Sequence, residues 1–131
     1  MSKDFQGWGD YQQELESRDK PRRPFQEGQV WRCAIGQNIG TEIDGKSRRY
    51  WRPVIVIRKF YDEFLIGVPL TSSSNKRPYY IPVTVKGRNG YAVVNQLRAL
   101  DARRLQQYLA TLSAREFEAV RAAVADLFEQ A

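Results

Sequence analysis

The sequence predicts a mainly β protein of the α+β class, a small β-barrel with a short N-terminal helix and a C-terminal helix. Runs rich in Val, Ile and aromatic residues recur at short spacing, with turn residues between them. The end of the chain shows a capped, helical apolar pattern. A length of 131 residues with 42% hydrophobic residues suits one small core.

The beginning of the chain predicts an appendage to this barrel. Residues 3–17 can form an amphipathic helix, although Gly7 and Gly9 weaken it. One face of that helix would hold Phe5, Trp8, Tyr11 and Leu15. The prolines and mixed charges that follow predict a linker. We therefore expect an appendage over residues 1–27 and a barrel domain over residues 28–131.

The barrel strands follow from alternating or β-branched runs. We expect strands over residues 29–35, 51–61, 64–71, 78–86, 91–100 and 108–112. Asp62-Glu63 predicts a tight turn, which makes the second and third strands antiparallel neighbours. Gly87–Gly90 contains an Asn-Gly hairpin signal. Two prolines in the fourth strand predict an edge position, because proline cannot donate to a neighbouring strand.

The remaining segments are a long loop, a single helical turn before the last strand, and the final helix after it. Residues 36–50 contain three glycines and no periodicity, which predicts a loop. Asp101 is the predicted N-cap of one helical turn and an expected ion-pair partner of Arg98. Ser113 begins a capping box for the final helix. The apolar face of that helix would hold Phe117, Val120, Val124, Leu127 and Phe128.

The composition excludes several kinds of chemistry. The chain has no histidine and one cysteine, Cys33, so it can form neither a Ser-His-Asp triad nor an intrachain disulfide. A zinc cluster is excluded for the same reason, and we expect no metal and no other cofactor. No apolar run could span a membrane, and the N-terminus lacks the apolar segment of a secretory signal. We expect a cytoplasmic protein without membrane contact.

The charge is concentrated in the middle of the chain. The net charge is +6, but Gly28 to Leu112 contains 14 basic and 5 acidic residues, an excess of +9. Such an excess favours an anionic partner. From charge alone, a nucleic-acid partner and an idle basic surface are about equally supported.

Arg52 and Thr71 are the first candidate site residues. Arginine stays protonated and presents a planar fork of donors that matches a phosphate. Arg52 begins a strand just after the long loop, and Pro53 favours an extended backbone there. The hydroxyls of Thr71 and Ser72 follow the next strand and can donate to phosphate oxygens. Taken singly, each has an equally plausible interpretation as a solvated strand end.

Further candidates lie in the loop and in the 91–100 segment. Glu42 could act as a weak base, although a surface ion pair is the simpler interpretation. Lys46, Arg49 and Trp51 could bind single-stranded nucleic acid by charge and stacking, or could serve packing alone. Gln96 is a plausible donor to a base edge or backbone.

Five segments in order carry a resemblance to a known family. They are Gly28–Trp31, Asn38–Glu42, Arg52–Ile57, Val68–Ser72 and Gln96–Leu105. Together they resemble the MazF/PemK toxins of bacterial type II toxin–antitoxin systems, over roughly Gly28 to Leu112 with the last helix also fitting. Residues 1–27 resemble the N-terminal helix of a longer PemK-like subgroup.

The resemblance implies an SH3-like barrel that forms a homodimer and is neutralised by a cognate antitoxin. It implies a metal-independent, sequence-specific endoribonuclease, an mRNA interferase that cleaves single-stranded RNA. In such enzymes the ribose 2′-hydroxyl attacks the adjacent phosphate and leaves a 2′,3′-cyclic phosphate. This chemistry needs neither metal nor histidine where charge stabilisation is strong.

The family's usual catalytic pair corresponds to Arg52 and Thr71, and Glu42 matches a loop acid that some members use. Other members use an aspartate and an arginine just before the Gln-x-Arg segment, where this chain has Asn95 and Val93. Their acid–base scheme does not transfer, so the general base stays unassigned.

Two alternatives to a ribonuclease remain open. The same barrel occurs in toxins resembling CcdB, which bind DNA gyrase, and an inactive RNA-binding relative would keep the fold. The Arg52 and Thr71 pair argues against the gyrase binder, which needs neither residue. An antitoxin is expected to lay an acidic, partly disordered tail over the basic groove, near Arg52 and the 36–50 loop.

Overall fold

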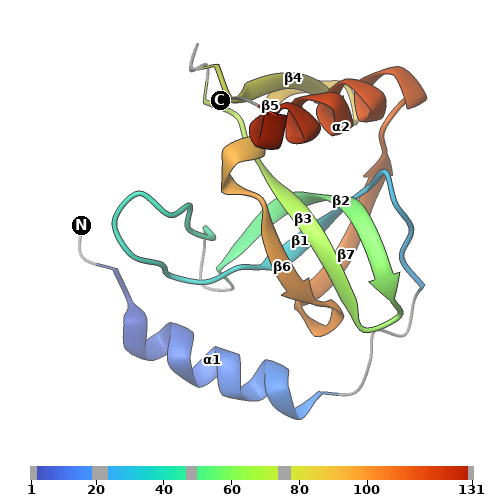
Figure 1. Ribbon diagram of the computed structural model, residues 1–131. Helices are drawn as coiled ribbons and strands as arrows, with labels where there is room; N and C mark the ends of the chain where they lie inside the picture. The colour runs from blue at the N-terminus through green and yellow to red at the C-terminus, as the bar shows by residue number, and fades with distance from the viewer. Residues whose placement is uncertain (1–2, 19–23, 47–49, 74–77, 130–131) are drawn as a thin grey trace.

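Seven strands form one antiparallel, barrel-like sheet with a helix near each end of the chain (Figure 1). The computed structural model describes residues 3–18, 24–46, 50–73 and 78–129. The helices are α1 (Phe5–Ser17) and α2 (Ala114–Glu129), with short 3₁₀ turns η1 (Val94–Gln96) and η2 (Ala102–Arg104). The strands are β1 (Gln29–Ala34), β2 (Trp51–Tyr61), β3 (Phe64–Thr71), β4 (Tyr80–Val85), β5 (Arg88–Val93), β6 (Arg98–Asp101) and β7 (Leu105–Thr111). The predicted fold class is confirmed.

The strand order explains how the sheet curls. It is β4-β5-β3-β2-β1-β7, and β6 also pairs with β3. One edge of β3 is shared, because Phe64–Gly67 pairs with β6 while Leu70 and Thr71 pair with β5. β3 therefore has β6 beside its first half and β5 beside its end, and the sheet curls at this strand. β4 lies at the edge, as its prolines predicted.

The β4–β5 hairpin is present, but its turn lies earlier than the Asn-Gly signal predicted. Lys86 and Gly87 both have a positive φ, 52° and 77°, as a two-residue turn between twisted strands requires. Asn89 and Gly90 belong to β5 and pair with Thr84 and Val83. Gly90 is needed for a different reason: a Cβ there would lie 3.0 Å from the Thr71 carbonyl oxygen of the neighbouring strand.

The segment 91–100, predicted as one strand, is broken in the middle. The turn η1 interrupts it, with the Val94 N–H donating to the Tyr79 carbonyl. The break lets β5 and β6 pair with opposite ends of β3. Asp101 caps η2 as predicted, but its ion pair is with Arg103 (Nε to Oδ1, 2.9 Å) rather than Arg98.

The hydrophobic core lies on both sides of the curled sheet. One cluster is centred on Phe25, Trp31 and Leu65. The other packs the sheet against α2, where Val120 is fully buried. Ser113 caps α2 as predicted, since its hydroxyl accepts from the Glu116 N–H, which is one of the two hydrogen bonds of a capping box. Phe128 was predicted to face the core, but it lies in the last turn of α2 and is exposed.

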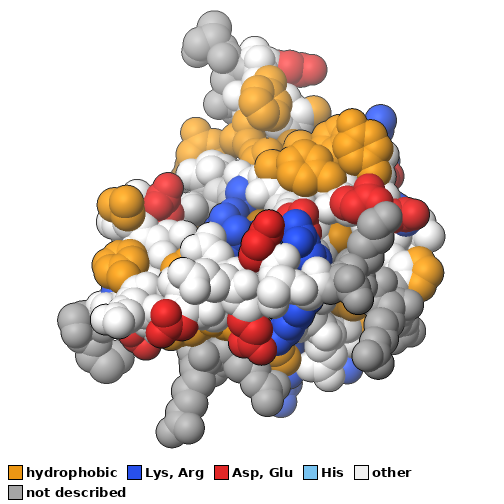
Figure 2. Space-filling view, turned by 90° about the horizontal axis from the view of Figure 1, so that it is seen from below, with side chains coloured by type: hydrophobic (Ala, Val, Ile, Leu, Met, Phe, Trp, Pro, Cys, Tyr) orange, Lys and Arg blue, Asp and Glu red, His pale blue; other side chains and the backbone are white. Residues whose placement is uncertain are grey.

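Helix α1 packs on the barrel through a third cluster. Trp8 and Leu15 are buried against Ala34 and Tyr50, and the Trp8 and Tyr50 rings lie 5.4 Å apart. Charged side chains of both signs cover the middle of the face seen from below (Figure 2). Arg103 of η2 pairs with Glu16 of α1 at 3.3 Å. Within the described residues, no helix is long and apolar enough to cross a membrane.

Candidate functional site

A basic groove of about 570 Å³ opens beside the starts of β2 and the β4–β5 hairpin. Its basic side chains are Arg32, Lys46, Arg52, Lys86 and Arg88. No acidic side chain is among the described residues that line it. Apolar side chains of Leu70, Val83 and Leu109 complete the walls. Five of the basic residues of the sequence therefore meet at one concave surface, which favours an anionic ligand.

Arg52 is the buried basic residue of this groove, with only 8% of its surface exposed. Its Nε donates to the Asp44 carbonyl oxygen at 2.6 Å, and its Nη1 donates to the Leu70 carbonyl oxygen at 3.1 Å. Burial lowers the pKa of the guanidinium, and the nearby charge of Asp44 opposes that shift. Both partners are neutral carbonyls, and no carboxylate of the described residues pairs with Arg52. Its positive charge is therefore available to a bound anion.

Thr71 and Ser72 line the same groove at the end of β3. The β2–β3 register pairs Val54 with Pro69, and continuing it two residues along each strand places Arg52 opposite Thr71. The Thr71 hydroxyl accepts a hydrogen bond from the Ser73 N–H at 3.2 Å, so its own proton remains free to donate. The Arg52 guanidinium and the Thr71 hydroxyl thus line the same groove from two adjacent strands.

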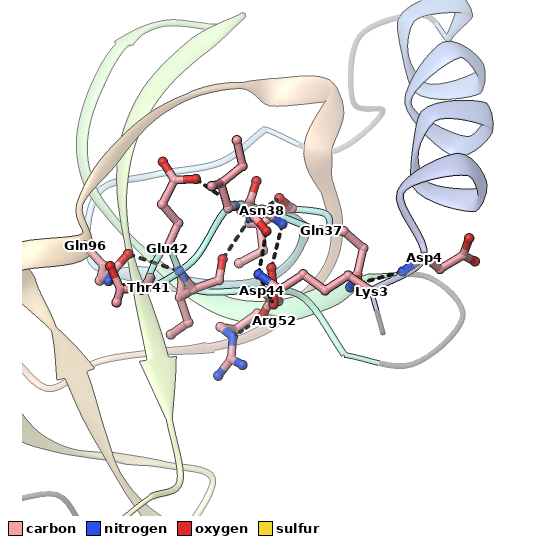
Figure 3. A network of polar contacts seen from close by, with 12 residues as sticks. Lys3, Asp4, Gln37, Asn38, Thr41, Glu42, Asp44, Arg52 and Gln96 are labelled. Atoms are coloured by element: carbon pink, nitrogen blue, oxygen red, sulfur yellow. Dashed lines mark hydrogen bonds and ion pairs between the residues drawn. The ribbon is translucent and has the colours of Figure 1, made fainter. Parts of the chain in front are cut away.

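Glu42 and Gln96 lie in a second groove, of about 460 Å³, together with Arg98. The Glu42 carboxylate accepts from the Ile39 N–H at 2.9 Å. The Gln96 amide accepts from the Ile43 N–H and donates to the Thr41 carbonyl (Figure 3). Both side chains therefore support the conformation of the loop, and neither lines the Arg52 groove.

Lys46 and Trp51, two further candidates, lie in the groove with Arg52. Their backbones form an isolated β-bridge that closes the loop, and both side chains line the groove. The Trp51 indole N–H donates to the Tyr11 hydroxyl at 3.2 Å, so its ring also contacts α1. Arg49 lies outside the described residues.

The sequence analysis did not single out Arg32, Lys86 and Arg88 as site residues. Arg32 is the exposed residue of β1, whose neighbours on both sides are buried, and Lys86 and Arg88 flank Gly87 in the turn of the β4–β5 hairpin. Alternation and turn chemistry mark all three as exposed, but only the closure of the sheet brings them to one groove. No pattern within the chain predicts that meeting.

Neither a metal site nor a thiol nucleophile is built at this groove. The described residues contain no group of three or more acidic, histidine or cysteine side chains that could hold a metal. Cys33 is fully buried in β1, and burial raises the pKa of its thiol to about 12, against the opposing charges of Arg104 and Arg98.

Solved structures share this fold. MazF of Deinococcus radiodurans (Form-I) aligns with a TM-score of 0.69 at 21% identity, over 82% of this chain and 99% of that one. The Deinococcus MazE–MazF complex (Form-II) aligns at 0.65 and 18% identity, over 83% and 99%. A mycobacterial endoribonuclease in complex with its cognate antitoxin aligns at 0.62 and 17% identity, over 80% and 95%. The fold therefore defines a barrel of the MazF type.

The family follows from the sequence itself. A family model described as the PemK-like, MazF-like toxin of type II toxin–antitoxin systems matches residues 26–128. The chain belongs to this toxin family, which confirms the resemblance. No curated protein sequence matches it significantly. Helix α1 lies before the matched residues.

Proposed function

We propose that the protein is a sequence-specific endoribonuclease toxin that cleaves single-stranded RNA without a metal ion. The observation that carries this proposal is the buried guanidinium of Arg52, held by two neutral carbonyls in a groove whose described lining has no acid. A fixed, unneutralised cation of this kind is suited to a phosphate whose charge grows during reaction. The family membership supports the same activity.

In the proposed mechanism the RNA backbone lies in the groove, and exposed Lys46, Lys86 and Arg88 bind phosphates beside the cut. Arg52 binds the scissile phosphate, and the Thr71 hydroxyl donates to one of its oxygens. The ribose 2′-oxygen attacks phosphorus and loses its proton, while the bond to the 5′-oxygen breaks and that oxygen gains a proton. The products are a 2′,3′-cyclic phosphate and a 5′-hydroxyl.

The base that receives the 2′-hydroxyl proton is not assigned to a residue. Arg52 stays protonated at neutral pH, so it acts as a cation. Glu42 reaches the scissile phosphate only if its loop rearranges, because its carboxylate lies in the second groove and accepts from Ile39.

The experiment is cleavage of a long single-stranded RNA by the purified protein in excess EDTA, with cut sites mapped by sequencing. We expect 5′-hydroxyl ends, no cleavage where the nucleotide before the cut is 2′-deoxy, and a loss of about 100-fold or more in Arg52→Ala. Arg58→Ala is the matched control, because Arg58 is an exposed arginine of the same strand outside the groove. Unchanged cleavage by Arg52→Ala would overturn the site assignment, and gyrase inhibition without any RNA cleavage would overturn the activity.

We further propose that the protein acts in the cytoplasm as a homodimer and is neutralised by a cognate antitoxin. The support is that similar structures include a MazE–MazF complex and an endoribonuclease with its antitoxin. An acidic antitoxin tail suits the basic groove, so antitoxin should displace a labelled RNA from it. Simultaneous binding of both would contradict this placement.

A further inference from the structure

Helix α1 contacts both ends of the loop that holds Arg52. We call residues 35–50 the β1–β2 loop, of which 35–46 and Tyr50 are described. Near the start of this loop, the Gln37 side chain accepts from the Asp4 N–H at 3.1 Å. At its end, the Tyr50 hydroxyl donates to the Asp4 carboxylate at 2.9 Å. The N-cap residue of α1 thus bridges the two ends of the loop.

A second set of contacts leads from Lys3, just before α1, through Asp44 to Arg52 (Figure 3). The Lys3 ammonium pairs with the Asp44 carboxylate at 3.2 Å and donates to the Asn38 carbonyl. The same carboxylate accepts from the Asn38 N–H at 2.6 Å. The carbonyl of Asp44 is the acceptor of the Arg52 Nε. Asp44 therefore connects the two: its carboxylate pairs with Lys3, and its carbonyl accepts from Arg52, the proposed catalytic cation.

The packing of α1 fixes the backbone of the loop at unusual conformations. Tyr50 has a φ of 57°, which non-glycine residues rarely adopt, and it is 7% exposed beneath Trp8. Gly36 has a φ of 88°, and a Cβ there would overlap the Trp8 ring. A non-glycine residue at positive φ persists only where surrounding contacts hold it. At Tyr50 those contacts are its packing against Trp8 of α1 and the hydrogen bonds that its carbonyl accepts from the Ile35 and Gly36 N–H groups.

We infer that Lys3, Asp4 and Tyr50 are positioning residues: through them α1 holds the β1–β2 loop so that the Asp44 carbonyl keeps Arg52 in the groove. The catalytic consequence rests on the proposed ribonuclease function, whereas the holding of Arg52 does not. A displacement of about 1 Å at a catalytic group can cost about 100-fold in rate, so a helix far from the reacting atoms can still control the reaction.

The experiment compares single and double variants of the full chain. Lys3→Gln removes the ion pair with Asp44, and Tyr50→Phe removes the hydrogen bond to Asp4 while keeping the buried ring. Lys3→Arg is the conservative rescue. Arg18→Gln is the matched control, because it removes a positive charge from the other end of α1, where Arg18 contacts Glu14 and Gln106. The measurements are solvent exchange of the Arg52 Nε–H by NMR, single-turnover cleavage and RNA affinity.

In the Lys3→Gln/Tyr50→Phe variant we expect Nε–H exchange to rise about tenfold and cleavage to fall about tenfold, with RNA affinity within about twofold of wild type. Lys3→Arg should match the wild type in all three measurements. An Nε–H as protected in the double variant as in Arg18→Gln would overturn the inference. If the double variant does not fold, each single variant decides, because Lys3→Gln leaves the Tyr50–Asp4 hydrogen bond in place and Tyr50→Phe leaves the Lys3 contacts in place. A wild-type protein that cleaves no RNA would overturn the proposed function, and the exchange measurement would still decide the inference.

Discussion

Arg52 and Thr71 are not marked as site residues by their sequence neighbours alone. The fold places them in one groove and supplies the hydrogen-bond partners that hold Arg52 there. The Arg52 guanidinium is held by carbonyls of Asp44 and Leu70, one from the loop and one from β3. The two hydrogen bonds come from two different nitrogens of one planar group, Nε and Nη1, whereas lysine would have to donate both from a single nitrogen. The residue type is therefore fixed by geometry as well as by charge.

At Thr71 we predict that the hydroxyl, and not the shape of the side chain, supports cleavage. Thr71→Val keeps the β-branched shape of a strand residue but removes the proposed donor, so the single-turnover rate should fall about tenfold. Thr71→Ser keeps the hydroxyl and should stay within about threefold of wild type. Rates that are equal in the two variants would contradict the role of the hydroxyl. Thermal unfolding of both variants controls for the lost hydrogen bond from Ser73.

The sequence predicted where Arg52 and Thr71 lie, because an Arg-Pro strand start and a strand ending in hydroxyls are local patterns. It did not predict what Glu42 and Gln96 do, because their partners are decided by the fold of the loop. Gln96 bonds to Thr41 and Ile43, which precede it by more than 50 residues. The roles of the proposed site residues in catalysis stay predictions.

At the scale of the helix, the two glycines of α1 are predicted to behave oppositely. A Cβ at Gly7 would overlap the Asp4 carboxylate and the Tyr50 hydroxyl, whereas nothing lies within 4 Å of one at Gly9. Gly9→Ala should therefore stabilise the protein by up to about 1 kcal/mol through helix propensity. Gly7→Ala should destabilise it, because the Asp4 carboxylate and the Tyr50 hydroxyl must both move to make room for the methyl group. Urea unfolding measures both, and equal changes of one sign would contradict the packing described.

The sequence could not separate these glycines, since both simply weaken a helical pattern. The same limit applies to the segment 91–100, whose alternation predicted one strand. In the structure η1 divides this segment into β5 and β6, which pair with different parts of the same edge of β3. Local periodicity carries no information about such shared edges. The division of the chain near residue 27 also stays a prediction, and α1 is packed on the barrel rather than separate from it.

Acid should loosen the contact between α1 and η2. The side-chain hydrogen bond from Arg103 lowers the pKa of Asp101 below its ordinary value of 3.8, and Arg103 also donates to the Glu16 carbonyl at 2.7 Å. A carboxyl with a lowered pKa contributes stability above its unfolded-state pKa and loses it as the pH falls through the folded-state value. We expect the free energy of unfolding to fall below about pH 4, and to fall less in Asp101→Asn. Parallel curves for the two proteins, from urea unfolding between pH 3 and 7, would refute this.

At the scale of the whole molecule, the closure of the sheet turns a scattered charge excess into one basic surface. Arg32 comes from β1, Lys46 from the loop, and Lys86 and Arg88 from the β4–β5 hairpin. The excess of 14 basic over 5 acidic residues predicted an anionic partner. Which of those residues share a groove depends on the order of the strands in the sheet, because residues far apart in the chain line the same groove.

The number of cations in the groove sets how strongly salt should weaken RNA binding. Each phosphate neutralised on a single strand contributes about −0.7 to the slope of log affinity against log salt, so five contacts predict a slope of about −3.5. Lys86→Gln/Arg88→Gln should reduce that slope by about 1.4. The control Arg115→Gln/Arg121→Gln removes the same charge from exposed positions of α2 outside the groove, and should leave the slope unchanged. Fluorescence anisotropy with a non-cleavable 2′-deoxy-containing strand measures all three proteins. Equal slopes for the two double variants would mean that RNA responds to the net charge of the protein and not to this groove.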